Sequence, residues 1–271
     1  MSPTVSHGRK PGAPRYGPPD APYWSAATKP LHVLAMLLPL IVFYEVGSFR
    51  WLRDDAGVRE GIKARWVIGR MFEAFGVHGL WMPPVLLIIV LLVWHFLLHE
   101  RWRVRPGVVG GMVLEALAWA VPLMVLGQLL YSVLLGAHTG GGAGALAGTA
   151  PGIAPVAALG LGARATIAVG AGLYEEMVFR MLAIALVHGL VHDVIGFSDK
   201  IGRVAAVVAS AAAFALYHEA APGAQGLDAA ALAYYFAAGL YFGAVYLLRG
   251  LGIVVGAHAA YDLAVLLLPT G

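Results

Sequence analysis

The sequence predicts an all-α fold, a polytopic transmembrane bundle of about seven to eight spans. The 271 residues are 60% hydrophobic and only 12% charged, whereas a soluble domain carries about 25% charged residues. The apolar runs continue for about 18 residues or more, which is typical of membrane-spanning helices and not of the alternating strands of a β-barrel. The chain contains no cysteine, so disulfides and thiol catalysis are excluded.

The charge balance indicates a membrane protein and not a nucleic-acid-binding one. The net charge is +3, and such an excess in a membrane protein reports basic cytoplasmic loops. The distribution of lysine and arginine predicts a cytoplasmic N-terminus and an outer C-terminus. Because the composition is rich in glycine and alanine, we expect a protein of the inner (plasma) membrane of a high-GC bacterium. We expect no nucleic-acid partner, and the pattern does not fix an oligomeric state.

The first 154 residues are predicted to hold a tail followed by membrane spans. Residues 1–30 contain seven of the sixteen prolines, which predicts a disordered cytoplasmic tail. Residues 60–76 place an apolar stripe opposite basic residues, the pattern of an interfacial amphipathic helix. The remainder of 31–154 holds three apolar runs, expected as spans at 31–49, at 80–98 and within 108–135.

The second half of the chain, residues 155–268, contains four more apolar regions. They lie at about 155–190, 204–217, 229–248 and 251–268. The first of these would be roughly 54 Å long as one straight helix, well beyond a hydrocarbon core of about 30 Å. It must therefore kink, tilt, protrude or break into two pieces.

Two adjacent carboxylates and an arginine interrupt this long apolar region, at Glu175, Glu176 and Arg180. Each charge inside a bilayer is costly, so the group needs a reason to be there. On a helix Glu176 and Arg180 are four residues apart and can pair, while Glu175 is turned about 100° away. The spacing leaves Glu175 available for chemistry. The alternative is a structural ion pair that orders a helix kink.

Further polar residues lie in the later spans. His218 is near the end of the fifth span, and the seventh holds His258 and Asp262 on one helix face. Each histidine alone is more often a hydrogen-bonded packing residue. Because all of them are expensive to bury without partners, the cheapest arrangement brings Glu175 and these side chains into one polar cavity that holds water.

Two glycines of the sixth predicted span indicate close helix packing, and a lone carboxylate in the third span has no assigned role. Gly239 and Gly243 lie one turn apart, so a neighbouring backbone can approach closely. Glu115 is a lone carboxylate in the third predicted span and is expected either to line the cavity or to make a helix contact.

A carboxylate and imidazoles around one water molecule are the parts of a hydrolase. A buried glutamate such as Glu175 suits the role of general base, and a histidine can hold the water or donate to the leaving group. Glu175, His218 and His258 are equally plausible ligands of a divalent metal such as zinc. Direct activation by glutamate and activation by a metal are both open at this point.

The four motifs together resemble one known family. Glu175-Glu176 with Arg180, Phe214 with His218, Phe236 with Gly239 and Gly243, and His258 with Asp262 are similar to the CPBP family of intramembrane proteases, also called the CAAX-protease, bacteriocin-processing or Abi family. The resemblance covers residues 155–268, which it marks as a catalytic helical core.

The resemblance implies a role for each matching residue. Glu175 and His218 would activate the attacking water, and His258 and Asp262 would support the scissile carbonyl or its oxyanion. The structural partners would be Glu176, Arg180, Phe214, Gly239 and Gly243. Eukaryotic CAAX-processing members carry Asn where this chain has Asp262, and a carboxylate donates to an oxyanion only when protonated.

The expected function is therefore that of an intramembrane endopeptidase. It would hydrolyse a peptide bond of a membrane-associated peptide or protein, in C-terminal tail or leader processing. Because the composition points to a bacterium, we do not expect a prenylated substrate. The alternatives are a non-catalytic immunity or scaffold factor and a proton-coupled transporter, and the lack of an inverted repeat in the sequence weakens the transporter hypothesis.

Overall fold

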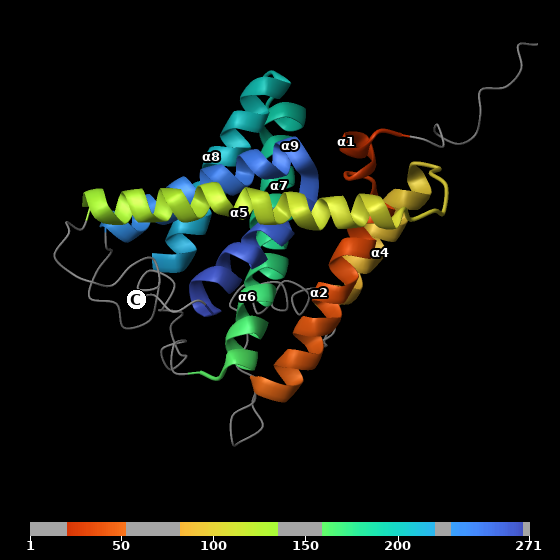
Figure 1. Cartoon of the computed structure of the whole chain (residues 1–271). Coiled ribbons are helices and arrows are strands. Elements are labelled where there is room, and N and C mark those ends of the chain that lie inside the picture. The colour runs from red at the N-terminus through yellow and green to blue at the C-terminus, as the bar shows by residue number, and fades with distance from the viewer. Residues whose placement is uncertain (1–20, 53–81, 135–158, 220–228, 268–271) are drawn as a thin grey trace, which may run out of the picture.

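A computed structural model of the chain describes residues 21–52, 82–134, 159–219 and 229–267 (Figure 1). These residues form helices and contain no strand, so the predicted all-α fold is confirmed. Five of the helical runs among them are long and apolar enough to cross a membrane, and a shorter apolar helix covers Pro83–Leu97. The predicted amphipathic helix at 60–76 lies outside the described residues.

The N-terminal half contributes four described helices. They are α1 (Tyr23–Ala26), α2 (Pro30–Trp51), α4 (Met82–Leu97) and α5 (Pro106–Leu134). Helix α5 runs steeply across the directions of α2 and α6 (Figure 1). It packs against α9 and α2.

The predicted disorder of residues 1–30 is wrong for the part of that segment that the structure describes, residues 21–30. Pro22 caps α1 and Pro30 is the first residue of α2. Proline is favoured at the start of a helix because its fixed φ is already helical and its missing N–H has no partner there. Tyr23 also donates a hydrogen bond of 2.5 Å to Glu115 on α5, which fixes the segment against the bundle.

The long region around Glu175 is one unbroken helical run with two wide-turn segments. It consists of α6 (Leu161–Glu176), the π-helix η3 (Met177–Ala183), α7 (Ile184–His188) and the π-helix η4 (Gly189–Val194). The run spans 34 residues. From its length we expected this region to kink, tilt, protrude from the membrane or break into two pieces, and the continuous helical run excludes the break.

The last two helices are α8 (Asp199–Glu219) and α9 (Ala229–Leu267). Gly250 has φ 79° and ψ −179° inside α9, so this helix consists of two pieces, 229–249 and 251–267. These pieces match the spans predicted at 229–248 and 251–268. A positive φ of this size is comfortable only for glycine.

Helix α9 lies at the centre of the described bundle, in contact with α6, α8 and α5. Glycines make these contacts close. A Cβ on Gly172 would lie 2.8 Å from the backbone nitrogen of Ala259, and one on Gly239 would lie 2.8 Å from the Cα of Ala211. A Cβ on Gly243 would lie 2.8 Å from a side-chain carbon of Val207. The missing side chains therefore let α6 and α8 pack directly on α9, and α9 carries His258.

A second polar group, the Glu115 cluster, joins the N-terminal segment to α5 and α9. It consists of Tyr23, Trp24, Glu115, Trp119 and Arg249. Arg249 donates from Nε to Glu115 Oε1 and from Nη2 to Glu115 Oε2, the latter over 2.8 Å. Its guanidinium also lies 4.1 Å from the centroid of the Trp24 ring. Glu115 thus makes a helix contact, and Arg249 is buried although the sequence places it at the end of a span.

Burial has a further effect on this cluster. Burial of Tyr23 and the negative charge of the nearby Glu115 carboxylate act together and raise the pKa of the Tyr23 hydroxyl to about 12. The Tyr23 hydroxyl therefore stays protonated and able to donate to Glu115 throughout the physiological pH range.

Candidate active site

Six polar side chains from three helical regions meet beside α9, and we call them the Glu175 cluster. The run that begins with α6 supplies Glu175, Glu176 and Arg180, α8 supplies His218, and α9 supplies His258 and Asp262. The sequence places these residues up to 87 positions apart, from 175 to 262. The contacts that join them are all 4 Å or shorter.

Glu175 faces both histidines of the cluster. Its Oε2 lies 3.5 Å from Nε2 of His218 and 3.9 Å from Nε2 of His258. The same oxygen is buried and has no hydrogen-bond partner. Its other oxygen, Oε1, accepts a hydrogen bond of 3.4 Å from the Tyr217 hydroxyl. Glu175 therefore turns one unsatisfied carboxylate oxygen toward two imidazole nitrogens.

The backbone of α8 orients His218. Its Nδ1 lies 2.9 Å from the carbonyl oxygen of Phe214, one turn earlier. A carbonyl oxygen only accepts, so Nδ1 carries the proton and donates. In the neutral ring Nε2 then presents its lone pair toward Glu175.

Three carboxylates surround the His258 ring, one at its Nδ1 and two at its Nε2. Its Nδ1 donates to Glu176 Oε1 over 2.6 Å. Its Nε2 lies 3.6 Å from Asp262 Oδ2 and 3.9 Å from Glu175 Oε2. From the sequence we expected Glu176 to act only as the partner of Arg180, and the direct contact to His258 was not predicted.

Glu176 and Arg180 form the buried floor of the cluster. Arg180 Nη1 lies 3.0 Å from Glu176 Oε1, as the spacing of four residues predicts, and both side chains are completely buried. Arg180 Nη2 also donates to the backbone oxygen of Gly239 over 3.5 Å. Glu176 Oε1 thus accepts a hydrogen bond from His258 and forms an ion pair with Arg180, which links the η3 segment to α9.

The π-helical segment η3 begins directly after Glu176 and contains Arg180. Its wider turns follow the site immediately, and π-helical turns inside α-helices occur frequently at functional sites. Sequence reasoning did not predict this segment, because a π-turn has no strong composition of its own.

Aromatic rings enclose the charged groups. The guanidinium of Arg180 lies 4.4 Å from the centroid of the Phe214 ring and 5.2 Å from that of Phe242. Phe242 stacks on His258 with centroids 4.6 Å apart, and Tyr235 stacks on His218 with centroids 4.2 Å apart. The rings fix the imidazole planes and keep the floor apolar around its ion pair.

Three of these aromatic residues were missed by sequence reasoning. Tyr217, Tyr235 and Phe242 directly precede His218, Phe236 and Gly243, which belong to the motifs. Their positions next to motif residues were the available signal. Tyrosine and phenylalanine are common in membrane helices, so that signal alone does not single them out.

The described residues hold no group of three or more His, Asp or Glu side chains that could bind a metal ion. Glu175, His218 and His258, the predicted ligand set, face one another at 3.5 and 3.9 Å but do not form such a group. We therefore derive no chemical step through a metal.

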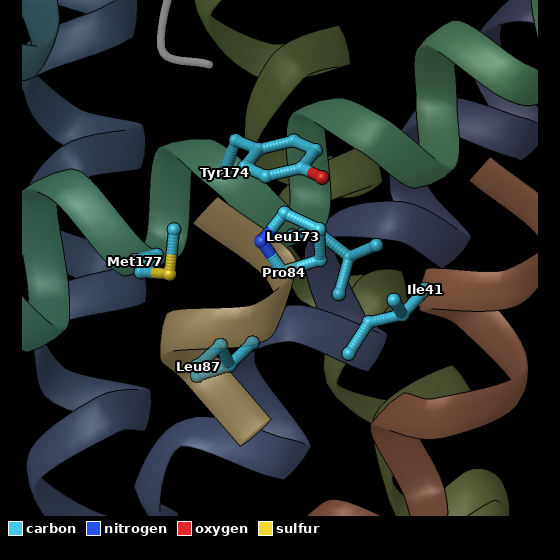
Figure 2. Close-up of a pocket in the computed structure, with 6 residues that line it drawn as sticks. All are labelled: Ile41, Pro84, Leu87, Leu173, Tyr174 and Met177. Atoms are coloured by element: carbon cyan, nitrogen blue, oxygen red, sulfur yellow. The ribbon is translucent and has the colours of Figure 1, made fainter. Parts of the chain in front are cut away.

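A narrow apolar pocket lies on the other side of α6, between α2 and α4 (Figure 2). It is lined by Ile41, Pro84, Leu87, Leu173, Tyr174 and Met177. On a helix Tyr174 is turned about 100° and Leu173 about 200° from Glu175. The residues that line the pocket carry no charge and include none of the Glu175 cluster, so the pocket and the cluster are separate features.

Comparison with known proteins bears on the part of the chain that holds the Glu175 cluster. Residues 157–264 match the sequence profile of a family described as type II CAAX prenyl endopeptidase, Rce1-like. The resemblance to the CAAX-protease (CPBP) family is thereby confirmed for this part of the chain. The searches of curated proteins and of solved structures gave no match. Together with the long apolar helices, the match identifies an integral membrane protein.

Proposed function

We propose that the protein is an intramembrane endopeptidase of the CAAX-protease type, with Glu175, His218, His258 and Asp262 at its centre. Its substrate would be a membrane-associated peptide or protein whose C-terminal tail or leader it removes, in the plasma membrane of a bacterium. One observation carries the proposal: a buried Glu175 oxygen without a hydrogen-bond partner faces the Nε2 atoms of two histidines from two other helices.

Glu175 and His218 are suited to activating a water molecule. Glu175 Oε2 and His218 Nε2 are both acceptors and lie 3.5 Å apart. Two acceptors at this distance repel unless a proton or a donor is shared between them. A water that donates one hydrogen to each meets that requirement, and its oxygen keeps a lone pair for attack on the scissile carbonyl carbon. Glu175 then takes the proton as general base.

His258 is suited to stabilising the negative charge that develops on the carbonyl oxygen. Glu176 accepts from Nδ1 and fixes the ring, and Arg180 holds Glu176 in place. When Nε2 also carries a proton it donates to the oxyanion, and the carboxylates of Glu176 and Asp262 neutralise the charge on the ring. Hydrogen bonds of this kind in a dry site contribute about 3–4 kcal/mol of transition-state stabilisation.

The second half of the reaction returns the proton. The carbon–nitrogen bond of the tetrahedral intermediate breaks, and the proton held by Glu175 passes to the departing amine. The products are a new carboxyl terminus and a new amino terminus, and the enzyme regains its starting state. Because the groups lie in a low-dielectric interior, each electrostatic contact is stronger than it would be in water.

The test is peptidase activity of purified Glu175→Gln and His218→Ala, with Glu100→Gln as the matched control. Glu100 pairs with Lys29 in a partly exposed contact far along the chain from the site. We expect each site variant to lose activity by about 100-fold to 10,000-fold, the range of a general base, and the control to keep it. If both site variants cleave at the parent rate, the proposal is wrong and a non-catalytic immunity or scaffold role replaces it.

The metal alternative is tested in the same preparation. Metal content of the purified protein and activity after dialysis against a chelator decide between the two mechanisms. We expect activity to persist with less than one bound metal ion per chain. Loss of activity on chelation with recovery on adding zinc would assign Glu175, His218 and His258 as ligands instead.

A further inference from the structure

The polar groups of the Glu175 cluster differ in how open they are. The side chains of Glu176 and Arg180 are 0% exposed, and those of His258 and Glu175 are 5% and 7% exposed. Asp262 is 18% exposed and His218 is 21% exposed. An incoming polypeptide that reaches Glu175 and His258 therefore meets Asp262 as the first carboxylate.

The charges of the cluster do not balance. Glu175, Glu176 and Asp262 supply three carboxylates, and Arg180 is the one guanidinium among them. The side chain of Arg180 is completely buried, in contact with Glu176 and over the rings of Phe214 and Phe242. A carboxylate on an incoming substrate therefore does not reach its guanidinium.

His258 does not offset Asp262 on its own. Its Nε2 is shared between Asp262 at 3.6 Å and Glu175 at 3.9 Å, and its Nδ1 is occupied by Glu176. Asp262 is the most exposed carboxylate of the cluster, and His258 is its charged neighbour among the described residues. The more exposed part of the Glu175 cluster therefore presents a carboxylate.

From this geometry we infer that Asp262 is a specificity-determining residue, which selects substrates with lysine or arginine beside the scissile bond and rejects those with aspartate, glutamate or a free terminal carboxylate there. The inference rests on the proposed peptidase function and adds the charge class of its substrate. Like charges brought together in a low-dielectric site repel strongly, and such repulsion is an effective source of discrimination.

The distances allow this contact. The scissile carbonyl must lie within hydrogen-bond reach of His258 Nε2, and Asp262 is 3.6 Å from that atom. Consecutive Cα atoms are about 3.8 Å apart, so the residues on both sides of the scissile bond lie close to Asp262. A lysine or arginine at either position can reach its carboxylate.

The test compares three pools of quenched fluorescent peptides that are random except for one fixed position beside the scissile bond. The fixed residue is Lys, Gln or Glu, and the full-length protein is assayed in nanodiscs. The readout is the ratio of kcat/KM for the Lys pool to that for the Glu pool, because a ratio measured on one preparation does not depend on the folded fraction. Wild type is compared with Asp262→Asn and Asp262→Glu, and Glu100→Gln is the control.

We expect a Lys-to-Glu ratio of about tenfold or more in wild type, Asp262→Glu and Glu100→Gln, falling to about onefold to twofold in Asp262→Asn. An unchanged ratio in Asp262→Asn, or a wild-type preference for the Glu pool, would overturn the inference while leaving the peptidase proposal intact. Wild type that cleaves none of the three pools would overturn the proposed function, and this inference with it.

Discussion

The Glu115 cluster is partly buried and the Glu175 cluster almost completely buried, and both hold charged groups, yet they are built in opposite ways. In the Glu115 cluster one carboxylate meets one guanidinium and every oxygen is used. Oε1 accepts from Trp119 Nε1 over 3.2 Å and from Arg249 Nε, and Oε2 accepts from Tyr23 and from Arg249 Nη2. Arg249 Nη1 donates in addition to the carbonyl oxygen of Trp24.

The Glu175 cluster is left incomplete by comparison. It has three carboxylates for one guanidinium, and Glu175 Oε2, Glu176 Oε2 and Arg180 Nε are buried without a hydrogen-bond partner. A buried polar network in which every group is hydrogen-bonded makes the fold rigid. A network with unsatisfied groups costs stability, and such groups are found mainly at functional sites. The difference fits a structural role for the Glu115 cluster and the chemical role that we propose for the Glu175 cluster, and it can be tested by removing partners from each.

The largest effect on stability is expected for Arg180→Met. The substitution leaves Glu176 buried without its guanidinium, which costs about 3–5 kcal/mol in the free energy of unfolding. Because Glu176 also orients His258, the fraction that still folds should lose activity as well. Thermal unfolding in detergent and kcat per folded molecule measure the two effects. Wild-type kcat in the folded fraction would contradict the assigned link between Arg180, Glu176 and His258.

A loss of stability without a loss of chemistry is expected for Arg249→Met. It leaves Glu115 without its cation and should cost about 3 kcal/mol, the lower end of the range for a broken buried pair. The double variant Glu115→Gln, Arg249→Met should recover part of this loss, because no uncompensated charge remains. Unfolding curves measure both, and kcat per folded molecule should stay at the parent value. A drop in kcat would show that the two clusters are not separate in function.

Tyr23→Phe should produce a smaller effect in the same cluster. It removes the 2.5 Å hydrogen bond to Glu115, and a hydrogen bond to a charged group contributes about 1.5–3 kcal/mol. Chemical unfolding or the midpoint of thermal unfolding detects this change. Unchanged stability would mean that the N-terminal segment contributes little to the bundle.

The smallest effect is expected for Tyr217→Phe, at the Glu175 cluster. The hydroxyl is 3.4 Å from Glu175 Oε1, a long hydrogen bond for which we expect about 1 kcal/mol. That corresponds to about a fivefold decrease in kcat with little change in stability. A pre-steady-state burst measurement separates the chemical step from product release. A decrease of more than a hundredfold would place Tyr217 itself among the reacting groups.

Much of this arrangement followed from local spacing and from the cost of burying charge. The length of the apolar runs predicts the helices, the interval of four residues predicts the Glu176–Arg180 pair, and the cost of isolated polar groups predicts that Glu175, His218 and His258 meet. These inferences work because membrane interiors penalise every unpaired polar group.

The features that could not be predicted depend on contacts between distant parts of the chain. Glu115 and Arg249 are 134 residues apart, and nothing local to either residue indicates the other. Tyr23 and Glu115 are 92 residues apart, and the prolines near Tyr23, taken alone, predict a disordered tail. The bond from Glu176 to His258 depends on how closely Gly172 lets α6 approach α9, a matter of packing and not of spacing.

The turn at Gly250 sets the rotational phase of the last helix. With φ 79° it begins a new helical piece beside the fixed Arg249, and His258 follows eight residues later, or roughly two turns. A single residue inserted between these positions would swing the imidazole about 100° around the helix axis, away from Glu175 and Glu176. The short peptide between Gly250 and His258 therefore works as a measured spacer, in which length matters more than side-chain identity.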